Sequence, residues 1–285
     1  MSMGNIQLND DGWSVKGCSI IYAPSGQAGE YAKLATNPYR GCGNRCSYCY
    51  VPAVLRMSRA EFDAGARPRD NFLLKLRNNA AKYRAAGITE QVMLSFTTDP
   101  YHPFDTSLTR EVLLTLKEYG LGFCTLTKGG KRAMRDIDLF RPDRDAFAST
   151  LTTLSPAASE EWEAGAALPE DRIATLRAFH EAGIYTWVSL EPVIDTETTL
   201  RIIRETHRFV DLFKVGRINY HRLTQLIDWK DFTAQVLREL NRTHSDYYIK
   251  EDLQPYLPKN YFNVKYRTQA RAAGVVDGRQ AATIH

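Results

Sequence analysis

The sequence predicts an α/β fold, a partial (β/α)6 barrel of the TIM type followed by a helical and irregular C-terminal extension. Three observations predict it. Apolar runs of strand length begin at intervals of roughly 25 to 38 residues, the spacing of a strand plus a crossover helix. The segments between them have helical periodicity, and several end in glycine. The region is too short for a complete eight-stranded barrel, which needs about 250 residues.

Six strands are expected before residue 220. The first lies near 33–36, after a polar N-terminal stretch that contains glycine. The other five are the apolar runs at 91–96 (QVMLSF), 121–126 (LGFCTL), 146–151 (AFASTL), 184–190 (IYTWVSL) and 209–215 (FVDLFKV). Short apolar runs in this regular alternation with helical segments are typical of βα units.

The clearest helix lies in NFLLKLRNNAAKYRAAG (71–87), where apolar residues recur every three or four positions and Gly87 ends the pattern. The apolar face consists of Phe72, Leu73, Leu76, Ala80 and Tyr83. The segments LTREVLLTLKEYG and EDRIATLRAFHEAG repeat this arrangement, and each ends in glycine before the next strand.

The chain contains no repeat with sequence identity, low-complexity tract or linker rich in proline and glycine within this region. We therefore expect an N-terminal segment (1–30), one barrel domain (31–220) and a C-terminal extension (221–285). The extension opens with a helix, RLTQLIDWKDFTAQVLREL, and its end is less regular.

The composition is that of an ordinary globular protein, with 44% hydrophobic and 25% charged residues. The formal net charge of +4 is too small to indicate nucleic-acid binding by itself. No stretch approaches the roughly 18 uninterrupted apolar residues of a membrane span, and the start MSMGNIQLNDDGW lacks the basic and apolar regions of a signal peptide. We therefore expect a cytoplasmic protein that makes no membrane contact.

Three of the five cysteines fall within eight residues, in NPYRGCGNRCSYCYVP. Cys42, Cys46 and Cys49 have the spacing C-x3-C-x2-C and directly follow the first expected strand. An odd cysteine count and this clustering do not fit a secreted disulfide framework. Thiolates are soft ligands suited to iron-sulfur clusters or zinc, and three of them leave one iron of a four-iron cluster open. The loop is therefore predicted to hold a [4Fe-4S] cluster.

A zinc knuckle is the alternative for these cysteines. It would need a fourth ligand, and such sites usually pair C-x2-C with a second pair or with histidines. The sequence has no second pair. The histidines occur singly, among them His102, His180, His207, His221 and His244.

The cysteine loop resembles the signature of the radical S-adenosylmethionine (SAM) superfamily, in which an aromatic residue, here Tyr48, precedes the last cysteine. The resemblance extends, in the same order, to SFTTDPYHPFD, LTK, EWEAGAALPEDRIATLRAFHEAGI and SLEPVI, and covers roughly residues 18 to 220. Together these segments are similar to the spore photoproduct lyase and DNA repair photolyase-like branch, whose partial (β/α)6 barrel agrees with the element count.

The resemblance implies an enzyme with two cofactors, a [4Fe-4S] cluster and SAM. In such enzymes the open iron binds the amino and carboxylate groups of SAM. One electron then releases methionine and a 5'-deoxyadenosyl radical, which takes a hydrogen atom from the substrate. The resemblance also implies an electron donor such as flavodoxin or ferredoxin.

The residues predicted to bind SAM come from the same resemblance. Tyr48 is expected to lie against the adenine. Thr97, Thr98 and Asp99 follow the second strand at the carboxyl end, the face at which βα barrels carry their sites. The remaining candidates are polar residues at the ends of the third and fifth strands, Lys128, Ser189 and Glu191. Residues of these types are also common in helix caps and ion pairs, so the family pattern carries the assignments.

One position departs from the lyase pattern. Spore photoproduct lyases carry a cysteine just before the T-S-D-P run, and this cysteine returns a hydrogen atom to the product radical. Phe96 occupies the position here, and a phenyl ring cannot donate that hydrogen atom. Cys124, in the next strand, is the candidate catalytic hydrogen donor if its side chain faces the barrel interior; the alternative is an ordinary buried cysteine.

Basic residues are concentrated in two segments. Between 55 and 84 lie Arg56, Arg59, Arg67, Arg69, Lys75, Arg77, Lys82 and Arg84, against Glu61, Asp63 and Asp70. Near the C-terminus KNYFNVKYRTQAR interleaves Lys259, Lys265, Arg267 and Arg271 with Tyr261, Phe262 and Tyr266. Cations for phosphates and rings for stacked bases are expected for single-stranded or extruded nucleotides. A solvated helix face and a packed tail would give the same composition.

Three hypotheses remain open. The first is a radical SAM enzyme that repairs or modifies a nucleobase in DNA or RNA, for which oligonucleotides should bind with salt dependence and stimulate SAM cleavage. The second is a radical SAM enzyme that acts on a peptide or small metabolite, for which oligonucleotides have no effect. The third is a non-enzymatic zinc-binding nucleic-acid module, which would be colourless.

Overall fold

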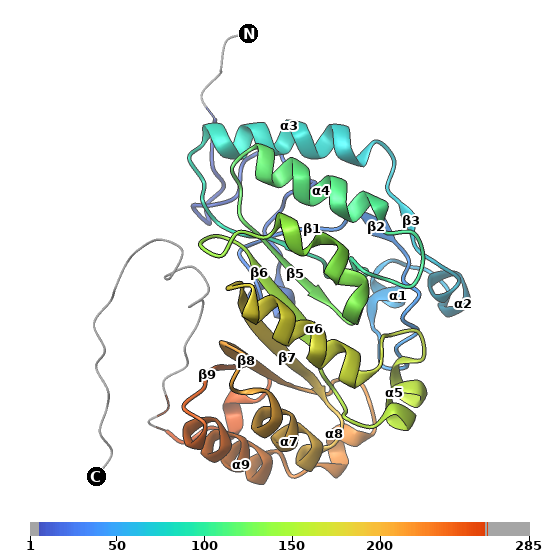
Figure 1. Cartoon of the computed structure of the whole chain (residues 1–285), viewed down its shortest axis with the longest axis vertical. Coiled ribbons are helices and arrows are strands. Elements are labelled where there is room, and N and C mark those ends of the chain that lie inside the picture. The colour runs from blue at the N-terminus through green and yellow to red at the C-terminus, as the bar shows by residue number, and fades with distance from the viewer. Residues whose placement is uncertain (1–5, 260, 262–285) are drawn as a thin grey trace.

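The computed structural model describes residues 6–259 and 261 of the 285-residue chain. Its central feature is a sheet of seven strands, all paired in parallel, in the order β1-β4-β5-β6-β7-β8-β9 (Figure 1). The strands are β1 (Leu34–Thr36), β4 (Val92–Leu94), β5 (Phe123–Thr127), β6 (Ala146–Thr150), β7 (Tyr185–Val193), β8 (Leu212–Arg217) and β9 (Asp246–Ile249). The short strands β2 (Tyr39–Arg40) and β3 (Arg67–Pro68) form a separate antiparallel pair.

The longer helices cover one face of the sheet in chain order (Figure 1). They are α3 (Phe72–Ala85), α4 (Ser107–Glu118), α6 (Pro169–Glu181), α7 (Thr196–Thr206) and α9 (Trp229–Arg242). Short helices lie in the loops that follow the strands, namely α1 (Val51–Val54), α2 (Arg59–Asp63), α5 (Pro156–Glu163) and α8 (Leu223–Leu226). Turns of 3-10 helix cover Gly26–Glu30, Gly130–Leu139 and Gln254–Tyr256. Within the described part of the chain, no helix has both the length and the apolar character needed to cross a membrane.

Side chains alternate between the two faces of each strand, which produces two cores. Phe123 of β5 and Phe147 of β6 belong to the large core beneath the helices, where Phe147 stacks on Phe179 of α6 with ring centroids 3.9 Å apart. Cys124 and Trp187 point to the opposite face and belong to a smaller core inside the barrel. The helices therefore cover the sheet from outside, and the smaller core lies on its inner face.

The predicted fold class is confirmed, including all six strands expected before residue 220. The three expected glycine stops are confirmed as well. Gly87, Gly120 and Gly183 have φ angles of +69°, +73° and +79°, the left-handed conformation that glycine adopts at helix C-termini. The 3.6-residue periodicity and its glycine ends therefore predicted three helices to within two residues.

The sheet continues into the segment that we expected to be an extension. The predicted helix after residue 221 is present as α8 and α9, and the chain then forms β9, which pairs in parallel with β8. The segment thus adds a further βα unit to the same sheet. A domain boundary near residue 220 stays a prediction.

The N-terminal segment connects the two edge strands across the barrel interior. Tyr22 exchanges backbone hydrogen bonds with Ala35 of β1. At its other end, Glu30 accepts hydrogen bonds from the Tyr248 hydroxyl and the Glu251 backbone N–H, at 3.0 and 2.7 Å. Buried Glu30 is therefore an anchor that ties this segment to the β9 side of the sheet.

Candidate functional site: the cysteine loop at the carboxyl ends of the strands

The cysteine loop lies between β2 and α1, next to the short helices α2 and α5 (Figure 1). Cys42, Cys46 and Cys49 are all free thiols, and Cys42 and Cys46 are only 9% and 8% exposed. Burial raises the pKa of each thiol, to about 12 for Cys46, and the charges of neighbouring cysteines add to the shift at Cys42 and Cys46. A bound metal reverses this preference because it stabilises the thiolate directly.

The three thiols do not converge on one point as the ligands of a single ion would. Among residues 6–259 and 261, no three His, Cys, Asp or Glu side chains converge as the ligands of a single ion. In a four-iron cluster each cysteine binds a different iron, so convergence on one point is not required. The donor set of three soft thiols in one buried loop fits the [4Fe-4S] cluster.

Two glycines allow the loop to pack against its neighbours. A Cβ atom at Gly43 would lie 2.3 Å from Cε2 of Phe104, and one at Gly165 would lie 1.9 Å from the Gly43 carbonyl oxygen. The backbone N–H of Ser47 donates to the Trp162 carbonyl at 2.8 Å. The cysteine loop and the end of α5 therefore touch backbone to backbone, which leaves no space for side chains at these positions.

Asp99 holds the loop from the side of β4. Its carboxylate accepts hydrogen bonds from Nδ2 of Asn44 within the loop, from the hydroxyl of Thr127, and from the backbone N–H groups of Lys128 and Tyr101. The neighbouring Thr98 hydroxyl donates to the Gly41 carbonyl at 2.7 Å. Both residues were predicted to bind SAM; here their side chains brace the loop that carries the cysteines.

Replacing Asp99 with asparagine is expected to destabilise the protein by about 1–3 kcal/mol, because one amide N–H then faces donors in a buried site. Because the cysteine loop would then be held less firmly, the variant should also bind less iron after reconstitution. Urea unfolding and iron analysis measure the two effects. Asp70→Asn, an exposed change, is the control. Equal stability of the two variants would contradict the bracing role.

Glu163 is a buried carboxylate that the sequence did not single out. It is 1% exposed and lies beneath the cysteine loop, where its oxygens contact the Tyr48 hydroxyl, Nη1 of Arg172 at 2.6 Å and Nζ of Lys128 at 3.9 Å. Burial opposes its ionisation, but Arg172 and Lys128 outweigh burial and hold the pKa below its usual range. Glu163 therefore fixes both Tyr48 and Lys128, and residue 163 also forms a backbone bridge with Cys46.

Ser189 and Glu191 meet a tyrosine from the N-terminal segment. The Tyr31 hydroxyl contacts the Ser189 hydroxyl at 2.8 Å and donates to Glu191. Nζ of Lys250 donates to the same carboxylate at 2.6 Å. Burial raises the pKa of Glu191 even though Lys250 and Tyr31 oppose the shift. The structure brings these two predicted residues together, and it adds Tyr31 and Lys250 from parts of the chain that we had not considered.

Several buried polar atoms near the loop have no hydrogen-bond partner within the described residues. They include Oγ1 of Thr97 after β4, Oγ1 of Thr152 after β6 and Oδ1 of Asn44 in the loop itself. A buried polar atom without a partner costs about 1–3 kcal/mol, so such atoms often serve a ligand. Of the threonines predicted to bind SAM, Thr97 is therefore the one whose hydroxyl is available.

Cys124 faces the barrel interior, as a hydrogen donor at this position would have to. Its Sγ accepts a hydrogen bond from Nε1 of Trp187 at 3.2 Å, and burial raises the pKa of the thiol to about 12. It precedes Lys128 by four residues, which is roughly 13 Å along a strand. A role as hydrogen donor stays a prediction, and the thiol lies deeper than the residues expected to bind SAM.

The structure describes all of the first basic segment but only a small part of the second. Arg56, Arg59, Arg67 and Arg69 lie in and around α1, α2 and β3, next to the cysteine loop. The second half of the first segment lies on the exposed face of α3, at Lys75, Arg77, Lys82 and Arg84. In the C-terminal segment, Lys259 and Tyr261 are described, whereas Phe262, Lys265, Tyr266, Arg267 and Arg271 lie outside the described residues.

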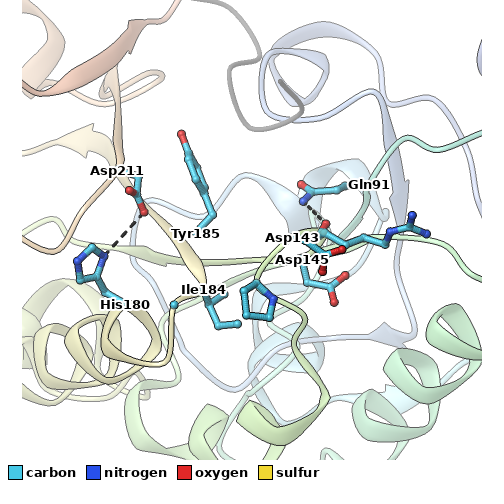
Figure 2. A pocket seen from close by; sticks show the side chains of 10 residues that line it. Gln91, Asp143, Asp145, His180, Ile184, Tyr185 and Asp211 are labelled. Carbon is cyan, nitrogen blue, oxygen red and sulfur yellow. Dashed lines mark hydrogen bonds and ion pairs between the residues drawn. The ribbon is translucent and has the colours of Figure 1, made fainter. Parts of the chain in front are cut away.

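A separate pocket of about 250 Å³ lies at the opposite end of the sheet (Figure 2). Its lining comes from the starts of strands and the loops before them, including Gln91, Tyr185 and Asp211. Asp145 in its wall pairs with Arg141 at 2.7 Å, and Asp211 accepts a hydrogen bond from the Thr186 backbone N–H. These carboxylates hold loops together, and the pocket is far from the end at which the cysteines lie.

The chain is similar in sequence to a mycobacterial protein and to a phage enzyme. An uncharacterized protein of Mycobacterium tuberculosis (strain ATCC 25618 / H37Rv) is 26% identical over 172 residues, covering 57% of this chain and 50% of that protein. The radical SAM Nalpha-GlyT isomerase of Pseudomonas phage M6 is 27% identical over 207 residues, covering 68% of this chain and 39% of that protein. The chain thus spans about half the length of the mycobacterial relative and less of the phage enzyme.

Solved structures share the fold, and a family model matches the sequence. Spore photoproduct lyase complexed with a dinucleoside spore photoproduct has a TM-score of 0.62 at 14% identity, over 82% of this chain and 79% of that one. Streptococcus suis SuiB bound to SAM has a TM-score of 0.59 at 13% identity, over 80% and 53%. The family model described as the radical SAM superfamily matches residues 36–210, more than half of the sequence. The chain belongs to the radical SAM superfamily and is an enzyme that uses a [4Fe-4S] cluster and SAM.

Proposed function

We propose that this enzyme uses the 5'-deoxyadenosyl radical to abstract a hydrogen atom from a nucleobase in DNA or RNA, in a repair or modification reaction. The observation that carries the substrate class is a set of aromatic side chains around the barrel mouth next to the cysteine loop. A planar substrate that stacks on them would present its C–H bonds to the radical.

Cys42, Cys46 and Cys49 would hold the cluster, which supplies the electron that cleaves SAM. The chain's own contribution is to keep these thiols in one geometry. Asp99 and α5 brace the loop from two sides, through hydrogen bonds and backbone contacts. Such bracing matters because a reactive geometry has to be held to within a fraction of an ångström.

Lys128, Tyr48 and Thr97 are the proposed SAM contacts. Nζ of Lys128 lies 5.6 Å from the centre of the Tyr48 ring, and Glu163 holds both residues. The ammonium group of Lys128 can pair with the SAM carboxylate, while the Tyr48 ring offers a face for the adenine. The hydroxyl of Thr97 has no hydrogen-bond partner within the described residues, so it can form a hydrogen bond with a polar group of SAM.

Tyr50, Phe96 and Tyr31 form the aromatic part of the mouth. Tyr50 follows the last cysteine, and its side chain is 55% exposed, so its ring is accessible to a substrate. Phe96 packs on Tyr31 with ring centroids 6.1 Å apart. Phe96, which replaces the lyase cysteine, thus contributes a ring face where the lyases have a hydrogen donor.

The relatives support two substrate classes unequally. One fold neighbour, spore photoproduct lyase, is complexed with a dinucleoside photoproduct, and another, SuiB, is bound to its precursor peptide. The shared fold covers 79% of the lyase chain, whereas it covers 48% of the SuiB chain in the peptide complex. The overlap with the lyase fold is therefore the more extensive of the two.

The test is a comparison of substrates with the anaerobically reconstituted enzyme, SAM and dithionite. Single-stranded oligonucleotides are expected to raise 5'-deoxyadenosine release over the uncoupled rate, and base-deuterated strands should transfer deuterium into it. Tyr50→Ala should weaken oligonucleotide binding by roughly 5- to 150-fold, the equivalent of about 1–3 kcal/mol of base stacking. Leu74→Ala, an exposed apolar change on α3, is the control.

Stimulation by peptides but by no oligonucleotide would overturn the nucleobase assignment and favour the peptide alternative. Affinity should also fall as salt rises, because phosphate contacts release counterions.

A further inference from the structure

Three arginines share one face of the short ribbon formed by β2 and β3. Arg40 of β2 pairs in register with Arg67 of β3. Directly opposite residues of an antiparallel pair point to the same face, and so do residues two positions apart along a strand. The ladder continues to Arg69, whose backbone N–H donates to the Pro38 carbonyl at 2.9 Å, so Arg69 shares the face of Arg67. We call Arg40, Arg67 and Arg69 the arginine triad.

The arginine triad has little counter-charge. Neither Arg40 nor Arg69 has a carboxylate partner within residues 6–259 and 261, and both are half-buried. Their guanidinium groups donate to backbone carbonyls, at 3.2 and 3.3 Å. Arg67 lies 4.0 Å from Glu61, but both side chains are largely exposed, and exposed ion pairs contribute little. Three cations therefore share one face, and only the exposed one has an acidic neighbour in the described part of the chain.

Two like charges that are half-buried together are unfavourable unless a further group compensates them. Burial lowers the pKa of Arg69, and the charge of Arg40 lowers it further. Nε of Arg40 is buried and has no hydrogen-bond partner among the described residues. Buried charges in proteins are normally paired, and a buried donor without an acceptor is unfavourable. An anion bound to both guanidinium groups would supply the missing charge and the missing acceptor.

The ribbon that carries the arginine triad is fixed to the body of the enzyme. Tyr39 of β2 is buried, and its hydroxyl accepts a hydrogen bond from the Thr109 backbone N–H at 3.0 Å. A Cβ atom at Gly41 would lie 2.1 Å from the Gly65 carbonyl oxygen, so the backbone after Arg40 touches the segment that follows α2. A rigid set of donors binds its ligand with a smaller loss of conformational entropy.

The ribbon lies beside α1 and the barrel mouth (Figure 1). Asn37, directly before it, accepts hydrogen bonds from the backbone N–H groups of Phe96 and Thr97 through Oδ1. Nη2 of Arg40 donates to the carbonyl at the C-terminal end of α1, and Tyr50 stands at the start of the same helix. Because α1 has four residues, it rises by only about 6 Å between these two points. The arginine triad and the exposed ring of Tyr50 are therefore close enough to contact one nucleotide strand.

We propose that the arginine triad binds one phosphate of the substrate strand, next to the nucleobase that stacks in the mouth. The inference rests on the proposed function, because it takes a nucleobase as the substrate. It adds that the substrate is part of a nucleotide strand and is neither a free base nor a nucleoside. Guanidinium groups bind phosphate oxygens through paired N–H donors. Phosphate contacts set the register of a strand, so the triad determines which base reaches the radical.

The experiment measures binding of a single-stranded oligonucleotide to the reconstituted enzyme with SAM, by fluorescence anisotropy. In a series of strands, one phosphate at a time is replaced by an uncharged methylphosphonate. Replacement at one position is expected to weaken binding roughly 10- to 100-fold, the range for hydrogen bonds between charged groups. Arg40→Gln combined with Arg69→Gln should weaken binding of the unmodified strand by a similar factor. The two changes together should have no further effect, because they remove the same contact.

The matched control is Arg77→Gln combined with Arg84→Gln, which replaces two exposed arginines of α3. It should leave the response to each methylphosphonate unchanged. In the Arg40→Gln, Arg69→Gln variant, the slope of log Kd against log salt should become less steep by about 0.7, the value for one phosphate contact on a single strand. If this variant binds less iron, Arg67→Gln repeats the test, because the Arg67 side chain is exposed.

The pattern of losses decides the proposal. Losses that coincide at one phosphate and do not add support it. Additive losses, an equal loss in the α3 control, or unchanged affinity of the Arg40→Gln, Arg69→Gln variant would overturn it. Weaker binding of a glutamate-rich peptide with unchanged oligonucleotide binding would assign the triad to a carboxylate, and the proposal would be wrong. If oligonucleotides neither bind nor stimulate the unmodified enzyme, the proposed function itself fails, and this inference fails with it.

Discussion

Replacing Cys46 with alanine is expected to abolish both the brown colour of the reconstituted protein and its cleavage of SAM. The unmodified protein should bind about four irons per chain, because three thiolates and one exchangeable ligand complete a [4Fe-4S] cluster. With one thiol missing, a second iron lacks a protein ligand and the cluster is lost. Iron analysis, the visible spectrum and release of 5'-deoxyadenosine after dithionite measure the effect.

The control is a cysteine outside the loop. Cys18 is half-buried and packs against the large core, away from the three clustered thiols. Cys18→Ala should keep iron content and SAM cleavage at the level of the unmodified protein. Retention of a full cluster by Cys46→Ala would mean that another residue supplies the ligand, and the assignment of the loop would then be wrong.

Replacing Glu163 with glutamine should destabilise the protein by about 3–5 kcal/mol, because it leaves the buried guanidinium of Arg172 without its counter-charge. The variant should also raise the KM for SAM more than it lowers kcat, since Tyr48 and Lys128 lose the group that positions them. Urea unfolding and SAM-dependent kinetics measure the two effects. Glu160→Gln, an exposed change in the same helix, should shift stability by no more than about 0.5 kcal/mol.

The effect of Glu163 has a defined pH dependence. Its folded pKa is lower than its unfolded pKa, which is about 4.3 for a glutamate. The stability that it contributes is therefore complete above the unfolded pKa and disappears as the pH falls through the folded value. The difference in unfolding free energy between the unmodified protein and Glu163→Gln should shrink below pH about 4. A difference independent of pH would show that ionisation of Glu163 is irrelevant.

The parts of the fold that were predictable are those that depend on local sequence. Largely apolar runs of six or seven residues and helices ending at Gly87, Gly120 and Gly183 have signals within a single window of sequence. The strand β9 was missed because DYYI is short and begins with a polar residue, and its place in the sheet depends on pairing with β8. Pairing between distant segments leaves no local pattern.

The cysteines that would bind the metal could be predicted from the sequence. The residues that hold the cysteine loop in place could be predicted only in part. Three cysteines in eight residues are a strong signal, whereas Glu163 lies in a helix that also contains two exposed glutamates. Its ion pairs are with Arg172, nine positions later, and with Lys128, which directly follows β5. Asp99 was found as a polar residue after a strand. Its actual contacts, with Asn44 and Thr127, required the folded chain.

The most direct test of the central claim is a crystal structure of the reconstituted enzyme with SAM. We predict that Cys42, Cys46 and Cys49 bind three irons of a [4Fe-4S] cluster and that the amino and carboxylate groups of SAM bind the fourth. A side chain of the protein on the fourth iron, such as another cysteine or a histidine, would contradict this account.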